Sequence, residues 1–394
     1  MATRQYSDNE FKNLKKWLDL NQDTKSEKIM NAELLEVISA DYKTNRVMLT
    51  NSCMGSLHLA LQTIGVGPGD EVIVDPIVVF AGMATMYANA VPVFADVQMD
   101  TFNICPNSIR DKISERTKAI ICTHHFGSMC DMAEIMKISE EFHIPVVEDC
   151  AHCLFATQND KYAGLFGHFG AFSFNHRKQL SAGQGGFLTI NTPEFEEKSK
   201  DKGFGRVPDR LTWNYSLSGI LSAVIHAQWE PAKSYVQKDH DLANLYSEAI
   251  EGCEWFVPQK IISSNWSAYH IWASKFDGEQ YGIDYEQFMK LLRENGADYF
   301  LPSFMPYGAF GLDPSPAYRY PIFSQPRAFP DSELGRGCPT MCPHYKGTLN
   351  YDEGACPNAE KIVPNLFNTV LSPIEDDRIH RYADGLKKTI QYFN

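Results

Sequence analysis

The sequence predicts an α/β protein with a mostly parallel sheet, and three observations support this. Short apolar segments typical of strands, at 46–49, 71–74, 92–95, 118–122 and 144–147, alternate with helix-like segments at 57–65, 81–90 and 132–142. Connections of this length favour βαβ units with right-handed crossovers, because a helix must return the chain to the same edge of the sheet. The composition, with 44% hydrophobic and 22% charged residues, is that of an ordinary globular protein.

The individual elements follow from local signals. The first 40 or so residues are polar and helix-forming, and Asn51 and Ser52 are good N-cap residues for a helix that ends at Gly65. The turn at 67–70 precedes the strand at 71–74. Beyond a long helix at 216–252, we expect a strand at 269–276 and helices at 285–295 and 376–392. With 394 residues, we predict an N-terminal arm and large domain at 1–250 and a small C-terminal α/β domain at 251–394.

Charge and hydropathy exclude several classes of protein. The net charge of −13 argues against a nucleic-acid partner, because phosphate backbones require a basic surface. We expect neither a secretory signal peptide nor a membrane span, because the N-terminus has no apolar stretch and no run of about 18 apolar residues occurs. The ten cysteines are scattered rather than closely spaced. They indicate a reducing, cytoplasmic location.

Lys178 is the first candidate catalytic residue. It follows a short aromatic strand at 172–174 and precedes the glycine-rich turn at 183–186. Burial would favour the neutral amine, which could form a Schiff base with an aldehyde cofactor near neutral pH. A lone lysine in such a place is more often a surface residue, so the interpretation depends on its neighbours. Asp149 and His124 follow strand-like segments and are expected at the carboxyl edge of the sheet, where ligands bind in such folds.

Four ordered motifs, at 51–61, 67–74, 147–152 and 172–186, resemble those of the DegT/DnrJ/EryC1/StrS sugar aminotransferases. The likeness is good over about 45–230 and weaker beyond, through 356–360. It implies the type I fold of pyridoxal-phosphate enzymes, with a large domain whose mostly parallel mixed sheet lies between helices and a smaller C-terminal α/β domain. It also implies pyridoxal 5′-phosphate as cofactor.

The resemblance assigns a role to several residues. Lys178 would form the Schiff base and then act as the base that moves the Cα proton. Asp149 would hold the proton on the ring nitrogen, although an aspartate here could also be only a helix cap. Ser173 and the helix start at Cys53 and Met54 would bind the phosphate. Many relatives have threonine in place of Met54, so only its backbone N–H would remain for this contact.

Three further positions lie around the cofactor in the resemblance. His152, where many relatives have glutamine, would stand near the ring oxygen, or could be an ordinary core histidine. Phe80 is the candidate for the ring that stacks on the cofactor. Asn214 would reach the phosphate of the neighbouring subunit, which implies a homodimer with shared active sites. Ser216 stands where the family often has arginine, so Arg177 and Arg206 become possible groups for a substrate anion.

The resemblance implies an aminotransferase that takes an amino group from glutamate or glutamine. The acceptor would be a keto sugar, nucleotide-linked, or a cyclitol ketone. Its contacts would come from the loop at 301–356, which contains Tyr307, Tyr318 and Tyr320.

Two alternatives remain open. Some relatives have histidine in place of the lysine and act as sugar dehydratases, and His176 lies only two residues from Lys178. The second alternative is a non-catalytic zinc-binding or regulatory protein, because Cys338, Cys342 and His344, with Cys356 further on, offer ligands for zinc. Their spacing is not that of a standard zinc finger.

Overall fold

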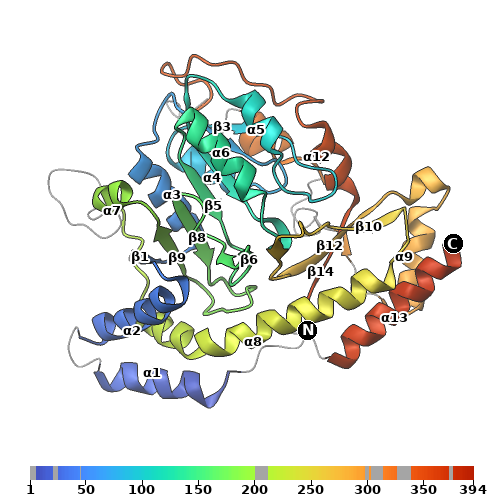
Figure 1. Cartoon of the computed structure of the whole chain (residues 1–394), viewed down its shortest axis with the longest axis horizontal. Coiled ribbons are helices and arrows are strands. Elements are labelled where there is room, and N and C mark those ends of the chain that lie inside the picture. The colour runs from blue at the N-terminus through green and yellow to red at the C-terminus, as the bar shows by residue number, and fades with distance from the viewer. Residues whose placement is uncertain are drawn as a thin grey trace.

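A computed structural model describes residues 6–20, 25–44, 46–199, 212–297, 301–302, 314–325, 339–371 and 376–394. A seven-stranded mixed sheet forms the centre of the molecule, in the order β1-β9-β8-β5-β4-β2-β3 (Figure 1). Its strands are β1 (Val47–Thr50), β2 (Glu71–Val74), β3 (Val91–Phe94), β4 (Thr117–Thr123), β5 (Val146–Asp149), β8 (Phe169–Ser173) and β9 (Gly186–Ile190). Only β9 pairs antiparallel with its neighbours; the other pairings are parallel. This confirms the predicted mostly parallel sheet.

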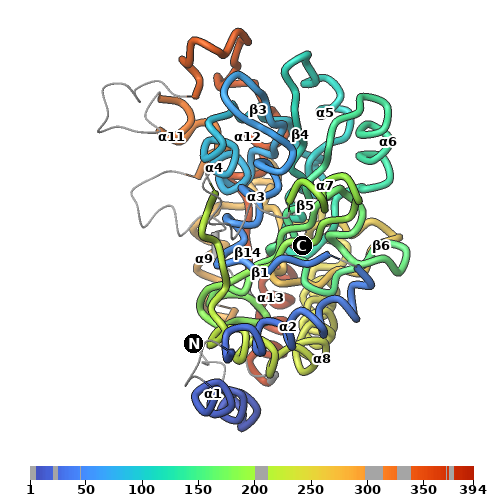
Figure 2. Tube along the Cα trace, turned by 90° about the vertical axis from the view of Figure 1, so that its left-hand side faces the viewer, coloured from blue at the N-terminus to red at the C-terminus, as the bar shows by residue number. Residues whose placement is uncertain are grey.

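Helices cover both faces of this sheet. The N-terminal helices are α1 (Asp8–Leu20), α2 (Lys25–Tyr42), α3 (Cys53–Ile64), α4 (Phe80–Tyr87), α5 (Pro106–Lys112), α6 (Met132–Phe142), α7 (Pro193–Ser199) and α8 (Gly219–Ala249). Alternate strand residues enter two different cores, as the two-residue period of a strand requires. Val72 and Val74 pack with α3 and α4, whereas Ile73 packs with α2, α6 and α8. Figure 2 shows α1 at the edge of the molecule, beside α2 and α8.

A smaller antiparallel sheet lies at the far end of α8 (Figure 1). It has the order β10-β12-β14-β13, with strands β10 (Phe256–Pro258), β12 (Ile271–Phe276), β13 (Leu301–Pro302) and β14 (Leu366–Val370). Helices α9 (Tyr285–Glu294) and α13 (Asp376–Phe393) pack on it through a third core. A minor sheet joins β6 (Thr157–Gln158), β7 (Lys161–Tyr162) and β11 (Asn265–Trp266).

The predicted boundary between two domains at residue 250 stays a prediction. Segments from beyond this residue also pack into the core formed by α3, α4 and the central sheet. Tyr318, Phe323 in α11 (Pro321–Ser324) and Ile362 in α12 (Pro357–Ile362) are buried among residues of α3, α4 and the central sheet. No helix among the described residues is both long and apolar enough to cross a bilayer.

Helix α3 has the predicted caps at both ends. The Ser52 hydroxyl accepts a hydrogen bond from the Gly55 N–H (3.0 Å), and Gly65 closes the helix in the left-handed conformation, with φ of 91°. The expected strand at 269–276 begins two residues later, at Ile271, because Tyr269 has a φ of 42°. This left-handed residue lets the chain pass close to Gly127, where a Cβ would lie 2.4 Å from the Tyr269 nitrogen.

Candidate active site

The carboxyl edge of the sheet brings together groups from four neighbouring strands. Asp75 follows β2, His124 and His125 follow β4, Asp149 ends β5, and Ser173 ends β8. The strands are parallel and hydrogen-bonded to one another, so their ends lie side by side. The predicted placement of Asp149 and His124 at this edge is therefore found in the structure.

Asp149 is buried, and its two carboxylate oxygens differ in surroundings. Oδ1 accepts a hydrogen bond from the Ala151 N–H (3.0 Å) and lies 3.6 Å from the Cys53 sulfur. Among the described residues, no hydrogen bond to Oδ2 is found. Burial raises the pKa of Asp149, while the Ala151 N–H, the positive charge of Lys178 and the Cys53 thiol act in the opposite direction. Oδ2 is thus the oxygen that could pair with a cationic ring nitrogen.

Lys178 lies on a loop that hydrogen bonds hold on both sides. The Phe174 N–H donates to Gly185 and the His176 N–H to Gly183, while the Lys178 N–H closes a turn onto Asn175 (2.9 Å). Burial lowers the pKa of the Lys178 amine to about 8, partly opposed by the neighbouring Cys53 and Asp149. His176 and Arg177 are exposed. Of the two candidates on this loop, Lys178 is half-buried with a desolvated amine and His176 is exposed, so Lys178 has the environment that a Schiff-base amine needs.

The start of α3 forms a cradle beside the end of β8. Gly186, which pairs with Ser173, approaches α3 so closely that a Cβ would lie 2.9 Å from the Cys53 nitrogen. Ser173 is half-buried, and its Oγ accepts a long hydrogen bond from the Asn175 N–H (3.3 Å). A helix N-terminus with a hydroxyl beside it favours an anion such as phosphate. Ser173 and the start of α3, at Cys53 and Met54, are thus brought close together through Gly186, and their binding of a phosphate stays a prediction.

His152 has a defined tautomer. The Phe126 N–H donates to its Nδ1 (3.3 Å), so the neutral ring carries its proton on Nε2. Burial, with the nearby charge of Lys178 and the rings of His270 and His125, lowers the pKa of His152 well below its usual range. The ring centroids of His152 and His270 are 4.8 Å apart. A neutral Nε2–H can donate a hydrogen bond, which fits the role beside a ring oxygen.

Phe80 and Asn214 are exposed, so their roles stay predictions. Phe80 begins α4, and 49% of its surface is accessible, which leaves the ring free to contact a ligand. The segment of Asn214 is held against α3, because the Asn51 N–H donates to the Tyr215 carbonyl (2.7 Å). The Tyr215 hydroxyl also bonds to Nδ1 of His58 (3.0 Å). The amide of Asn214 itself meets only the Ser216 hydroxyl (3.1 Å) among the residues described.

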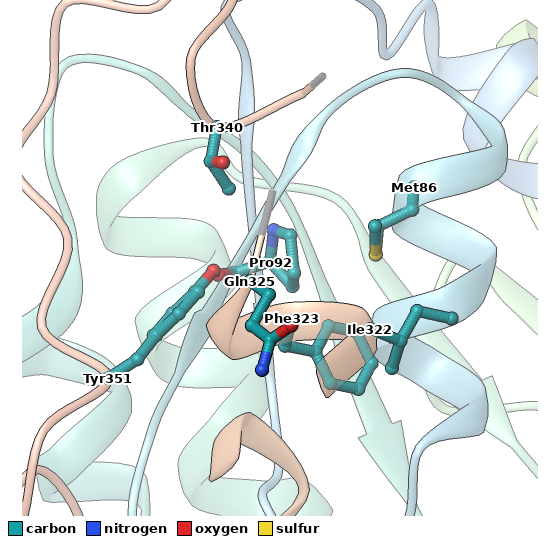
Figure 3. A pocket seen from close by; sticks show the side chains of 7 residues that line it. All are labelled: Met86, Pro92, Ile322, Phe323, Gln325, Thr340 and Tyr351. Carbon is teal, nitrogen blue, oxygen red and sulfur yellow. The ribbon is translucent and has the colours of Figure 1, made fainter. Parts of the chain in front are cut away.

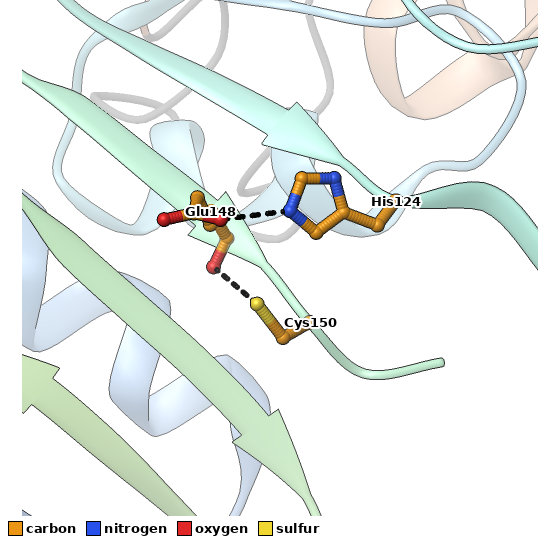
Figure 4. A group of neighbouring side chains, drawn as sticks. All are labelled: His124, Glu148 and Cys150. Atoms are coloured by element: carbon orange, nitrogen blue, oxygen red, sulfur yellow. Dashed lines mark hydrogen bonds and ion pairs between the residues drawn. The ribbon is translucent and has the colours of Figure 1, made fainter. Parts of the chain in front are cut away.

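Glu148 precedes Asp149 in β5 and is the centre of a buried hydrogen-bond network that could not be read from the sequence. Its carboxylate accepts hydrogen bonds from Gly164, Phe166 and Gly167 at 2.9, 2.7 and 2.6 Å. His124 supplies a fourth: its Nδ1 accepts from a backbone N–H, so its Nε2–H donates to Glu148 (3.0 Å; Figure 4). An acidic residue directly after the apolar segment predicted as a strand at 144–147 was the available signal.

His124, Glu148 and Cys150 are near enough to suggest a metal site, and they form the one such group among the described residues. The carboxylate is already filled by four donors, and the Cys150 thiol points to the Glu148 carbonyl (3.8 Å; Figure 4). The contacts are those of a structural hydrogen-bond network.

A second buried pair missed from the sequence is Asp75 and His125, whose Oδ1 and Nε2 are 2.7 Å apart. Both side chains are fully buried, and His125 lies close enough to influence His152 electrostatically. His270 is the fourth residue missed. It comes from the far side of residue 250, so only the tertiary structure could bring it here.

The residues of the zinc alternative do not form a ligand group where they are described. Cys342 is buried, His344 is exposed, and the Cys356 thiol donates to the Phe94 carbonyl (3.7 Å). Cys338, like Arg206 and Tyr307, lies outside the described residues.

Two other hollows lie away from Lys178. One is lined by side chains of α4, β3 and α11 together with Gln325, Thr340 and Tyr351 (Figure 3). It has no room for a water molecule. The other, of about 250 Å³, lies at the amino ends of β2 and β4. Its buried Glu71 is already bonded to Ser114, Arg116 and Tyr345.

Known proteins resemble this chain in sequence and in fold. GDP-perosamine synthase of Escherichia coli O157:H7 is 34% identical over 203 residues, which are 50% of this chain and 56% of that protein. A putative L-glutamine:3-amino-2,3-dideoxy-scyllo-inosose aminotransferase of Micromonospora echinospora is 27% identical over 58% of the chain and 57% of its own length. The chain thus spans little more than half of either relative.

The solved structure of 3-amino-5-hydroxybenzoic acid synthase superposes with a TM-score of 0.81 and 21% identity, over 100% of this chain and 98% of that one. A putative sugar aminotransferase of Streptococcus pneumoniae, solved in its PLP form, has a TM-score of 0.74 and 18% identity over 100% and 98% of the chains. The expected type I fold is confirmed. The model of the DegT/DnrJ/EryC1/StrS aminotransferase family matches residues 5–330. With this match over most of its length, the chain belongs to the DegT/DnrJ/EryC1/StrS family of pyridoxal-phosphate-dependent aminotransferases.

Proposed function

We propose that this protein transfers an amino group from glutamate or glutamine to the ketone of a nucleotide-linked sugar or a cyclitol. The family match and the names of the perosamine and inosose relatives support the reaction and the acceptor class. The observation that carries the proposal is the placement of the Lys178 amine, whose pKa burial lowers to about 8, within electrostatic reach of the buried carboxylate of Asp149. We also propose that the reaction takes place in the cytoplasm, in line with the scattered cysteines.

The described residues fit each part of the cofactor. Lys178 would hold it covalently, Asp149 would face its ring nitrogen through Oδ2, and His152 would donate its Nε2–H to the ring oxygen. Ser173 and the N-terminus of α3, at Cys53 and Met54, would bind its phosphate. When bound, pyridoxal phosphate acts as an electron sink for the negative charge that develops at the donor carbon.

Lys178 would carry out the proton transfers. Its amine is neutral in an appreciable fraction of molecules near pH 7, because burial holds its pKa at about 8. It would therefore accept the proton from the donor Cα and deliver it to the cofactor carbon that is bonded to the transferred nitrogen. Donor and acceptor would use this site in turn. Phe80 would stack on the cofactor ring from the solvent side.

Paired variants test the assignment of the base. Lys178→Ala should lose transamination and covalent attachment, shown by the missing cofactor mass after borohydride reduction and peptide mass spectrometry. His176→Ala, on the same loop but exposed, should keep both. The opposite pattern, with His176 essential and Lys178 dispensable, would support the dehydratase alternative.

Screening keto sugars and inososes with donors labelled in the α-amino group would identify both substrates.

The shared active site of the proposed homodimer is tested by complementation. Lys178→Ala and Asn214→Ala should each be impaired, because they damage different contributions to one site. A heterodimer of the two contains one fully native site if Asn214 acts across the interface. Mixing and reassociating equal amounts should then restore about a quarter of the native activity, as expected for random pairing of two-fold dimers. No recovery, with heterodimers verified by mass spectrometry, would place Asn214 in its own subunit's site.

A further inference from the structure

The side chain of Cys53 contacts Asp149, whereas the role expected of Cys53 is at the cofactor phosphate. The resemblance assigns the start of α3 to the cofactor phosphate, for which the backbone of Cys53 suffices. Its sulfur, however, lies 3.6 Å from Oδ1 of Asp149, the residue at the ring-nitrogen end. Cys53 therefore spans both ends of the site, with its backbone at the cradle and its thiol at the carboxylate.

The chemistry of this contact is that of an S–H donor and a carboxylate acceptor. Burial and the adjacent Asp149 raise the pKa of the Cys53 thiol well above its usual value. The sulfur consequently keeps its proton at neutral pH, and it is not a thiolate nucleophile. A distance of 3.6 Å is within the range of hydrogen bonds that involve sulfur.

Ala151 donates to the same oxygen from its backbone N–H, at 3.0 Å. Two donors on Oδ1 leave the carboxylate with a single orientation, in which Oδ2 is the oxygen available to the site. The Ser52 cap fixes the first turn of α3, which in turn fixes the position of the sulfur.

We propose that Cys53 is a positioning residue, whose thiol orients Asp149 and keeps it ionised opposite the cofactor ring nitrogen. The proposal rests on the proposed roles of Lys178 and Asp149. Without the thiol, the buried carboxylate loses one of the few groups that favour its charged form. It should then take up a proton more readily and hold the ring nitrogen in its protonated form less well.

The contact can be tested first in the apoprotein, without reference to activity. The rate of Cys53 alkylation by iodoacetamide is followed against pH by peptide mass spectrometry, with the half-buried Cys105 as internal standard. In Asp149→Asn the negative charge is gone, so Cys53 should react about three- to tenfold faster at a given pH, relative to Cys105. An unchanged ratio would overturn the proposed contact.

The effect on the cofactor is tested in the holoenzyme with three variants. Cys53→Ala removes the donor, Cys53→Ser keeps one, and Cys105→Ala is the matched control. We expect Cys53→Ala to lower kcat by roughly fivefold, equivalent to about 1 kcal/mol for one hydrogen bond, and to shift the pH dependence of the bound cofactor's absorbance spectrum. Cys53→Ser should lie between this variant and the native protein.

Equal kcat and equal spectra in all three variants would refute the positioning role. So would a Cys53→Ala variant whose only defect is weaker cofactor binding, because that result points to the phosphate cradle. Should Cys53→Ala fail to fold, Cys53→Ser and the alkylation experiment still decide the question. Failure of the proposed function itself would show separately, as full activity in Lys178→Ala.

Discussion

Replacing Lys178 with methionine should stabilise the apoprotein, although it abolishes the proposed activity. Burial lowers the pKa of this lysine from 10.5 to about 8, so folding disfavours its charged form. Methionine is unbranched and of similar length, and it carries no charge that must lose its water. Lys178 thus lowers the stability of the native protein while it provides a reactive amine.

The pKa difference sets the size of the effect. With about 1.4 kcal/mol for each unit of pKa, the ammonium form of Lys178 destabilises the apoprotein by about 3 kcal/mol. Asp149 loses a nearby cation in the variant, which offsets part of the gain. We therefore expect a net stabilisation of about 1–3 kcal/mol at pH 7.

The pH dependence of this stabilisation follows from the linkage between proton binding and folding. The unfolded chain binds the lysine proton more tightly than the native protein does, so native stability rises with pH between about 8 and 10.5. The destabilisation by the charged amine is therefore fully present below pH 8, and it decreases as the pH rises above 8. The advantage of Lys178→Met over the native sequence should therefore shrink as the pH rises through this window.

Urea unfolding of cofactor-free protein between pH 6.5 and 9.5, followed by circular dichroism, measures this difference. The cofactor must be removed, because a ligand that binds only the native state adds its own stabilisation. Lys137→Met is the matched control, since Lys137 is exposed and paired with Glu134 at 2.6 Å on the surface of α6. A Lys178→Met variant that is less stable than the native apoprotein at pH 7, or equally stable at every pH, would refute the assignment of a desolvated lysine.

Three further changes probe the scaffold, each by urea unfolding. Glu148→Gln should destabilise by about 3–5 kcal/mol, because an NH2 group then faces buried donors; a loss below about 1 kcal/mol would contradict the network. Gly186→Ala should lower the free energy of unfolding by more than about 2 kcal/mol and weaken cofactor binding, because its Cβ would lie 2.4 Å from a backbone oxygen. Gly67→Ala is the control and should be nearly neutral, because a Cβ there would meet nothing within 4 Å. Ser52→Ala should cost about 1 kcal/mol through the lost helix cap, and an unchanged midpoint would argue against that cap.

Most of the fold could be predicted from local sequence patterns. The helix at 132–142 and the strand at 71–74 have the predicted bounds, and α3 ends at Gly65 as expected. These elements depend on short-range patterns of apolar, capping and turn residues, which a single sequence displays. The late start of β12 was not predicted, because the backbone of Tyr269 is set by its close approach to Gly127.

The sequence by itself determined the α/β class and the family, and it predicted the group of Lys178, Asp149, Ser173 and His152, because these residues lie on motifs that follow one another along the chain. Only the tertiary structure decided which atoms meet. The distance from the Cys53 sulfur to Asp149, the four donors on Glu148 and the approach of His270 to His152 join segments about 20 to 120 residues apart. Burial was likewise decided there, and burial is what holds the pKa of Lys178 at about 8.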